Sequence, residues 1–312
     1  MRSIEHMGGM VPSEGPSGSS ANVEDHAART EDSDTQASRN AQKRYRADGE
    51  VTKSVPNARH WTLRLAAPLT IAALIAVWQL ACTLGLVPSF MLPSPVAVLR
   101  ALITDWPLLA GHTATSLAEA GLGLAAGVAL GFVAAVCMDR FEVLYRAFYP
   151  LVVLTQTVPT VAIAPLLVLW FGYGMLPKVV LIVVATFFPI TVGLLEGLRS
   201  VDSDEVDLMR SMGATRMQIM RHAKLPAALP QFFSGLKISA AYAIVGAVIA
   251  EWLGGFSGLG VYMTRVRKAY SFDKMFAVIF LISALSLVLM WAVGALRRAA
   301  MPWERCTRDR DV

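Results

Sequence analysis

Six long apolar runs constrain the fold of this chain more than any other feature of its sequence. A helix of roughly 20 apolar residues crosses the ~30 Å hydrocarbon core of a bilayer. Strands of a membrane barrel would be shorter and would alternate apolar with polar residues. The sequence therefore predicts an all-α polytopic membrane protein with six transmembrane helices. The runs are Leu65–Leu84, Leu117–Met138, Tyr149–Phe171, Pro177–Leu198, Phe232–Leu253 and Met275–Leu296.

The composition agrees with a membrane protein and excludes several classes of function. The 312 residues are 55% hydrophobic and 16% charged, whereas soluble domains have about 25% charged residues. The three cysteines have no zinc-site spacing, and neither HExxH nor GxxxxGK[ST] occurs. We therefore predict no catalytic residues, no metal ligands and no cofactor. If the chain uses ATP, another polypeptide hydrolyses it.

Polar segments flank and interrupt the apolar region. Residues 1–60 are rich in Ser, Gly, Asp, Glu and Arg and contain almost no aliphatic clusters, a composition typical of disorder. We expect a disordered tail at 1–60, a transmembrane domain at 61–304 with a cytoplasmic loop at 200–226, and a cytoplasmic C-terminal tail at 305–312.

Lysine and arginine are distributed unequally between the connectors. With six spans, both termini and two connectors share one side of the membrane and hold 18 basic residues, whereas the other side holds 6. Basic connectors remain in the cytoplasm, so both termini are predicted to be cytoplasmic. The segment from Arg265 to Lys274 disagrees, because it is as basic as the cytoplasmic connectors. The net charge of +5 thus reflects topology, and we expect no nucleic-acid partner.

The connector between the fourth and fifth runs is too polar to span and too regular for a slack linker. Asp202 is placed as a helix N-cap, and Thr215 with Gln218 has the pattern of a capping box. Gly213 interrupts the pattern, and Pro226 is expected to end the second helix. The connector therefore predicts two short helices that meet at Gly213.

One face of these two helices is predicted to be apolar. Val206, Met209, Gly213, Met217 and Met220 recur at helical spacings of three and four residues. Such a face either docks into a groove of a partner protein or lies among the lipid headgroups. Periodicity alone leaves both alternatives open.

The same connector resembles a family signature. Gly213 followed by Leu225 and Pro226 resembles the EAA loop of permease subunits in binding-protein-dependent ABC importers, although Asp207 stands where the family has Glu and Ala223 where it has Ile. The resemblance implies that this loop docks on the ATPase subunit. The coupling residues that it implies are Asp207, Gly213, Ala214, Arg216, Met217, Met220, Leu225 and Pro226.

Other segments resemble the nitrate, sulfonate and taurine branch of these permeases, so that the resemblance covers about residues 62–304. It implies the MetI-like ABC importer permease fold, with coupling helices, in a bacterial cell membrane. The implied partners are cytoplasmic ATPase subunits, an extracytoplasmic binding protein, membrane lipid and a second copy of the permease. The resembling segments are Leu92-Pro-Ser-Pro-Val-Ala-Val-Leu99, His112-Thr-Ala-Thr-Ser-Leu117, Gln156 to Leu166 with Trp170-Phe-Gly172, and Ser257-Gly-Leu-Gly260.

Polar residues within the spans are candidates for the transport pathway. Ionisable groups in a membrane usually face a bundle interior or a water-filled cavity. Prolines free backbone carbonyls, which is tolerated mainly where the backbone is buried in protein or lines a cavity. Ordinary helix packing by small and hydroxylated residues is the alternative. The candidates are Gln156, Pro159, Ser239, Tyr242 and Glu251.

The solute is expected to be small and polar. The stretch from Phe233 to Gly254 and the ending Met301-Pro-Trp303 resemble permeases for hydroxymethylpyrimidine-type thiamine precursors, and a carboxylate such as Glu251 suits a neutral or weakly basic heterocycle better than an anion. A nitrate-, sulfonate- or taurine-type solute is the alternative. A self-sufficient secondary transporter or channel is an alternative of another class, which inverted repeats would favour.

Overall fold

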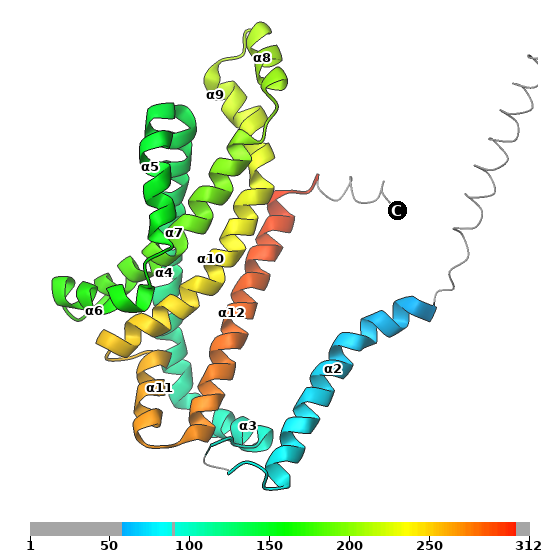
Figure 1. Cartoon of the computed structure of the whole chain (residues 1–312), viewed down its shortest axis with the longest axis vertical. Helices are drawn as coiled ribbons and strands as arrows, with labels where there is room; N and C mark the ends of the chain where they lie inside the picture. The colour runs from blue at the N-terminus through cyan, green and yellow to red at the C-terminus, as the bar shows by residue number, and fades with distance from the viewer. Residues whose placement is uncertain (1–57, 89–90, 304–312) are drawn as a thin grey trace, which may run out of the picture. The chain divides into compact units, whose positions relative to one another are not determined.

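The described residues are entirely helical or irregular. A computed structural model describes residues 58–88 and 91–303, and no strand occurs in these ranges. Apart from residues 58–60, the predicted tail at 1–60 lies outside them, as does the predicted tail at 305–312. The elements (Figure 1) are α2 (Ala58–Thr83), α3 (Pro95–Thr104), α4 (Trp106–Arg140), α5 (Glu142–Thr155), α6 (Thr160–Phe171), α7 (Met175–Arg199), α8 (Ser203–Ser211), α9 (Arg216–Ile219), the π-helical turn η1 (Met220–Lys224), α10 (Leu225–Gly254), α11 (Leu259–Lys268) and α12 (Phe272–Ala300).

The chain divides into two compact units within α2. The first unit is Met1–Ala72 and the second is Ala73–Val312. Of the first unit, the structure describes only the N-terminal part of α2. All the contacts considered below belong to the second unit.

Membrane-spanning length is reached by most of the predicted runs. In the described part of the chain, four helical stretches are long and apolar enough to cross a bilayer, namely Trp106–Arg140, Met175–Arg199, Arg216–Gly254 and Phe272–Ala300. The helix pair α5 and α6 counts as a fifth if it is one span, whereas Pro68–Thr83 is a shorter apolar helix. The all-α, multi-pass membrane fold is thus confirmed, and the exact number of six spans stays a prediction.

The third predicted run is not one straight helix. It bends by 99° between α5 and α6. Pro159 has no backbone N–H to donate and adopts an extended conformation with a φ of −61° and a ψ of 119°, so helical hydrogen bonding stops before it. The hydroxyl groups of Thr155 and Thr157 donate to the carbonyls of Val152 and Leu154, at 2.6 and 2.8 Å, respectively. The carbonyl of Leu154 also accepts from the backbone N–H of Thr157 at 3.0 Å, so the threonine hydroxyls add hydrogen bonds to carbonyl groups next to the break.

The core is built where α7 packs along α10 and α4 packs against α7. Glycine permits the close approach, because a Cβ atom on Gly235 of α10 would collide with the carbonyl of Pro189 on α7, and one on Gly127 of α4 would collide with Thr186 of α7. Leu194 and Ile190 are completely buried. Small residues at helix crossings are typical of packing within membranes, where lipid provides no hydrophobic drive for association.

Figure 1 shows that the short elements lie at opposite ends of the long helices. The C-terminal end of α4, the start of α5, and α8 with α9 lie at one end, whereas α3 and α11 lie at the other. The cytoplasmic loop predicted at 200–226 is therefore separated by the length of the bundle from the basic segment at 265–274.

Candidate functional site

Two short helices meet at Gly213, as the sequence predicts. The side chain of Asp202 caps α8 by accepting from the backbone N–H of Asp204, and Thr215 and Gln218 form the capping box of α9. At the turn, Gly213 has a φ of +85°, a left-handed backbone conformation that residues with a Cβ atom rarely adopt. The backbone N–H of Gly213 donates to the carbonyl of Arg210, and that of Ala214 donates to the carbonyl of Met209, both at 2.9 Å. This pair of bonds is a Schellman motif.

Pro226 does not end the second helix, contrary to the prediction from sequence. The backbone passes from α9 through the π-helical turn η1 directly into α10, where Pro226 occupies the first turn. The N–H of Leu225 donates to the carbonyl of Met220, five residues earlier. The wider turn makes room for the proline ring, which in a regular α-helix would collide with the carbonyl four residues before it. The loop is consequently connected to α10 by continuous helix.

The predicted apolar face of the loop is divided in the structure. Val206 is buried, and Met220 packs against the core formed by α4, α5, α7 and α10. Met217 instead is 74% exposed, together with Leu208 at 62% and Met212 at 79%. We refer to Leu208, Met212 and Met217 as the apolar tip. These three exposed side chains belong to α8, α9 and the turn between them.

The remaining coupling candidates have mainly local contacts. Asp207 is exposed and forms an ion pair with Arg210 on the same helix at 2.8 Å, and Arg216 is exposed at the start of α9. Leu225 is half-buried at the start of α10. The structure thus places the eight coupling candidates on one continuous segment at one end of the bundle.

Three of the five predicted pathway residues line one cavity. Gln156, Pro159 and Tyr242 surround a space of about 250 Å³ at the break between α5 and α6. Thr155, Thr160 and Gly246 also line it, with aliphatic side chains of α7 and α10. Among its described lining residues there is no Asp, Glu, Lys, Arg or His. The cavity therefore offers neutral hydrogen-bonding groups to an occupant.

The other two candidates lie outside this cavity and are buried. The hydroxyl of Ser239 donates to the carbonyl of Thr186 at 3.0 Å, which joins α10 to α7. Glu251 is 1% exposed. Its carboxylate accepts from the hydroxyl of Ser116 at 2.5 Å and from the N–H of Gly260 at 2.6 Å. Both side chains are thus engaged in contacts between helices.

Glu251 belongs to a larger buried cluster that sequence reasoning identified only in part. Lys178 on α7 lies 2.5 Å from Glu119 on α4, with their side chains 7% and 3% exposed. Ser116 also accepts from the N–H of Leu259, at 2.9 Å. Lys178 is one of the six basic residues that the charge distribution assigned to the side opposite the termini. The sequence did contain a signal for this pair. Glu119 lies within one apolar run and Lys178 lies at the edge of another, and buried charges require partners.

Comparison with known proteins agrees with this arrangement. Residues 127–301 match the family described as "Binding-protein-dependent transport system inner membrane component". The chain belongs to this family. The permease is 38% identical over 232 residues to a "Probable ABC transporter permease protein" of Haemophilus influenzae, covering 74% of this chain and 95% of that protein. Members of the family are membrane transport components, so the permease is a transport subunit and not an enzyme.

Two further relatives have names that specify a solute. The permease is 36% identical over 233 residues to a formylaminopyrimidine transport permease protein of Halalkalibacterium halodurans, covering 74% of this chain and 93% of that protein. It is 32% identical over 259 residues to a taurine transport system permease protein of Escherichia coli, covering 80% and 92% of the two chains.

A solved structure shares the fold of the permease. An inward-facing structure of the MetNI methionine ABC transporter superimposes with a TM-score of 0.51 at 22% sequence identity, covering 62% of this chain and 96% of that chain. This likeness confirms the fold class that the sequence resemblance implied.

At the end of the permease opposite to α8, Asp105 joins three helices. It receives a hydrogen bond from the hydroxyl of Tyr262 at 2.5 Å and pairs with Lys274 at 2.8 Å. The pKa of Asp105 is held below its ordinary value of 3.8. The largest cause is the hydrogen bond from Lys274, and the next is the hydrogen bond from Tyr262. Burial and the neighbouring carboxylate raise the pKa of Tyr262. Lys274, one of the basic residues that disagreed with the charge distribution, is therefore neutralised within the fold.

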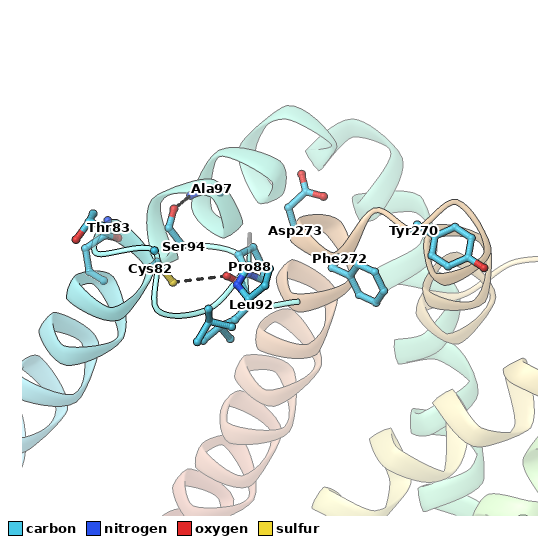
Figure 2. A pocket seen from close by; sticks show the side chains of 13 residues that line it. Cys82, Thr83, Pro88, Leu92, Ser94, Ala97, Tyr270, Phe272 and Asp273 are labelled. Atoms are coloured by element: carbon cyan, nitrogen blue, oxygen red, sulfur yellow. Dashed lines mark hydrogen bonds between the residues drawn. The ribbon is translucent and has the colours of Figure 1, made fainter. Parts of the chain in front are cut away.

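A larger cavity of about 680 Å³ lies between the α2–α3 connection and the start of α12. Figure 2 shows Cys82, Pro88 and Leu92 on one side of it and Asp273 on the other. One of its polar side chains already has a partner within the protein. The hydroxyl of Ser94 accepts from the N–H of Ala97 and caps the start of α3. None of the five pathway candidates lines this cavity.

Proposed function

We propose that the permease is the transmembrane subunit of an ATP-driven importer whose solute is delivered by an extracytoplasmic binding protein. The family match and the relatives named as ABC transporter permeases support this function. The continuous helix from α9 through η1 to α10 carries the proposal furthest, because it joins the exposed side chain of Met217 directly to a membrane-spanning helix. Movement of a partner at that side chain would be transmitted along α10.

The apolar tip is the proposed docking surface for the ATPase subunit. Its three side chains are exposed on a segment that charge and capping residues otherwise make polar. Methionine is flexible and polarisable and adapts well to a groove of a partner protein. Gly213 sets the angle between α8 and α9, and Arg216 and Asp207 supply charge beside the tip.

Both termini are proposed to be cytoplasmic in a bacterial cell membrane. The basic residues Arg140, Arg199 and Arg210 belong to the elements at the α8 end of the bundle, and such residues favour the cytoplasmic side. The segment from Arg265 to Lys274 disagreed with this orientation. Because Lys274 is paired with Asp105, this segment has one unpaired positive charge fewer than its sequence indicates. The ATPase would then meet the apolar tip in the cytoplasm.

The cavity at the helix break is proposed to be part of the transport pathway. Gln156, Pro159 and Tyr242 line it, and irregular backbone at membrane depth is tolerated where it lines such a cavity. We propose that Ser239 and Glu251 hold helices together beside the pathway. A second copy of the chain is the proposed partner that completes the pathway, since ABC importers use two permeases.

A pyrimidine thiamine precursor is the proposed solute. The uncharged, hydrogen-bonding lining of the cavity suits a neutral heterocycle, and the formylaminopyrimidine relative supports the same class. An organic sulfonate is the second candidate, because the taurine relative covers a larger share of this chain. A sulfonate would enter this cavity without a cationic partner, which is the physical reason for ranking it second.

Reconstitution tests both the class and the solute. The permease would be placed in liposomes together with its ATPase subunit and its binding protein, and ATP-dependent uptake of labelled aminopyrimidine and taurine would be compared. We expect uptake of the aminopyrimidine that requires all three components. Uptake by the permease alone would contradict an ATP-driven importer, and uptake of taurine in place of the pyrimidine would reverse the order of the two solutes.

A further inference from the structure

A small basic cavity lies between the end of α4 and the segment from α8 to η1, which we refer to as the coupling segment. It has a volume of about 200 Å³, and four cationic side chains and one carboxylate line it. Arg140 comes from the end of α4, Arg210 from α8, Arg216 from the start of α9 and Lys224 from η1. The carboxylate is that of Asp139. The cations therefore converge from separate elements, which only the tertiary structure brings together.

The charges of this cavity are not balanced by its own carboxylate. Lys224 and Asp139 neutralise each other, because the ammonium donates to both carboxylate oxygens at 2.7 and 2.9 Å. Arg210 has an exposed partner in Asp207. In the part of the chain that the structure describes, Arg140 and Arg216 form no ion pair with a carboxylate, although Arg140 lies over the ring of Phe141 at 5.1 Å. Like charges around one space repel each other, and a bound anion would relieve that repulsion.

The shape and chemistry of the lining select a class of anion. Guanidinium groups present paired N–H donors whose geometry matches phosphate oxygens. The apolar side chains of Val206, Ile219 and Met220 line the remainder of the cavity. The cavity is thus a basic site beside an apolar surface, and basic pockets at the cytoplasmic ends of transmembrane helices bind lipid headgroups.

The cavity is distinct from the apolar tip. None of the three tip residues lines it. Arg140 is the last residue of α4 and lies two residues after the apolar run Leu117–Met138, and the ends of membrane-spanning apolar runs lie near the level of the headgroups. An anion bound here would bridge α4 to α8 and α9 while the tip stays exposed.

We propose that this cavity binds a phosphate-bearing anion that fastens the coupling segment to the end of α4. The occupant is either the headgroup of an anionic phospholipid or a free phosphate compound. The site goes beyond the proposed transport function, because anion binding requires neither the ATPase nor the transported solute.

Direct binding to the full-length permease tests the proposal. Pyrophosphate is titrated into detergent-solubilised protein by calorimetry at constant ionic strength, with chloride as the comparison anion. In parallel, lipid retention is measured by native mass spectrometry from nanodiscs of phosphatidylcholine with and without phosphatidylglycerol. The variants are Arg216→Gln, the double variant Arg210→Gln/Arg216→Gln and the charge-retaining Arg216→Lys. Arg221→Gln is the matched control, because Arg221 is exposed on η1 and does not line the cavity.

The expected result is binding that depends on the lining arginines. The double variant should weaken pyrophosphate affinity or phosphatidylglycerol retention about tenfold or more, since it removes two guanidinium groups that would donate charge-assisted hydrogen bonds to the phosphate. Arg216→Lys should lose less, and Arg221→Gln should behave as the wild type. Retention of phosphatidylglycerol without pyrophosphate binding assigns the site to lipid, and the reverse assigns it to a free anion.

Two outcomes would overturn the proposal. One is the absence of preferential binding of either ligand by the wild-type protein, a result that does not depend on how any variant folds. The other is an equal loss in Arg221→Gln and in the double variant, which would indicate general attraction to a basic surface. Because both measurements are made without ATPase or transport, they are independent of the test of the proposed function.

Discussion

Lys178 on α7 and Glu119 on α4 form an ion pair of 2.5 Å that solvent scarcely reaches. The second carboxylate oxygen of Glu119 is buried without a hydrogen-bond partner among the described residues. Glu251 lies near enough to interact electrostatically with both groups. One lysine therefore compensates a cluster with two carboxyl groups, at the junction of α4, α7 and α10.

Removal of Lys178 alone should destabilise the permease strongly. Lys178→Met leaves the carboxylate of Glu119 buried without its cation, and breaking a buried pair in this way costs about 3–5 kcal/mol. The double variant Glu119→Gln/Lys178→Met should recover the part of the loss that comes from Glu119, because the unpaired carboxylate of Glu119 is then gone and no longer repels Glu251. The measurement is the thermal unfolding midpoint in detergent. Arg146→Gln is the control, since the pair of Arg146 with Glu142 is exposed and such pairs contribute little.

Gly235 should tolerate no side chain. In Gly235→Ala the new Cβ would collide with the backbone of Pro189, so α7 and α10 must separate, at a cost of about 1–3 kcal/mol. Gly294→Ala is the matched control, because a Cβ there meets nothing within 4 Å. The unfolding midpoint should fall for the first variant and stay or rise for the second. Equal midpoints would contradict the close approach of the two helices.

Gly213 should be required for transport and not for insertion into the membrane. Gly213→Val forces a β-branched residue into a left-handed conformation with a φ of +85°, which should change the angle between α8 and α9 and abolish ATP-driven uptake. Gly213→Asn should retain part of the uptake, since asparagine tolerates this conformation better. Membrane yield and elution volume should stay unchanged in both. Normal uptake by the valine variant would exclude the proposed coupling role.

Tyr242 should contribute to solute binding through its hydroxyl. Tyr242→Phe removes one hydrogen-bonding group from the cavity lining and should raise the KM of uptake up to about tenfold, the cost of one lost hydrogen bond. Tyr149→Phe is the control, because Tyr149 packs against the core near α4 and α7 and does not line the cavity. The KM is measured in the reconstituted system. An equal change in both variants would remove the cavity from the pathway.

Asp105 should make stability depend on acidic pH. Its folded-state pKa is lowered relative to 3.8 by hydrogen bonds from Lys274 and then Tyr262. The stabilisation is therefore fully present above the unfolded value and is lost as the pH falls through the folded value. Asp105→Asn should flatten the dependence of the unfolding midpoint on pH in this range. Tyr262→Phe should shift the loss to higher pH, and an unchanged profile in both would show that other groups control acid unfolding.

Local features of the sequence predicted the caps of the two short helices correctly. Asp202 and the Thr215–Gln218 capping box are where the pattern placed them, because a cap depends on residues within one turn. The effect of Pro226 was predicted wrongly. Sequence rules treat proline as a helix terminator, whereas here the π-helical turn before it absorbs the ring.

For the pathway candidates, too, the sequence predicted the type of residue but not its surroundings. Gln156, Pro159 and Tyr242 come together at one cavity, whereas Ser239 and Glu251 lie buried in contacts between helices. All five are polar or helix-breaking residues in apolar runs. Which of them face open space depends on the 99° bend between α5 and α6, and the apolar pattern of the third run does not give that angle.

The sequence by itself determined that this chain is an all-α membrane protein with two short helices between its fourth and fifth apolar runs, since apolar length and capping patterns are local properties. Only the tertiary structure decided which charges meet. Lys178 and Glu119 are 59 residues apart in the chain, and Ser116 and Glu251 are 135 apart. Buried charges and hydroxyl groups must find partners in an apolar medium, and the packing of α4, α7 and α10 determines which partners are within reach.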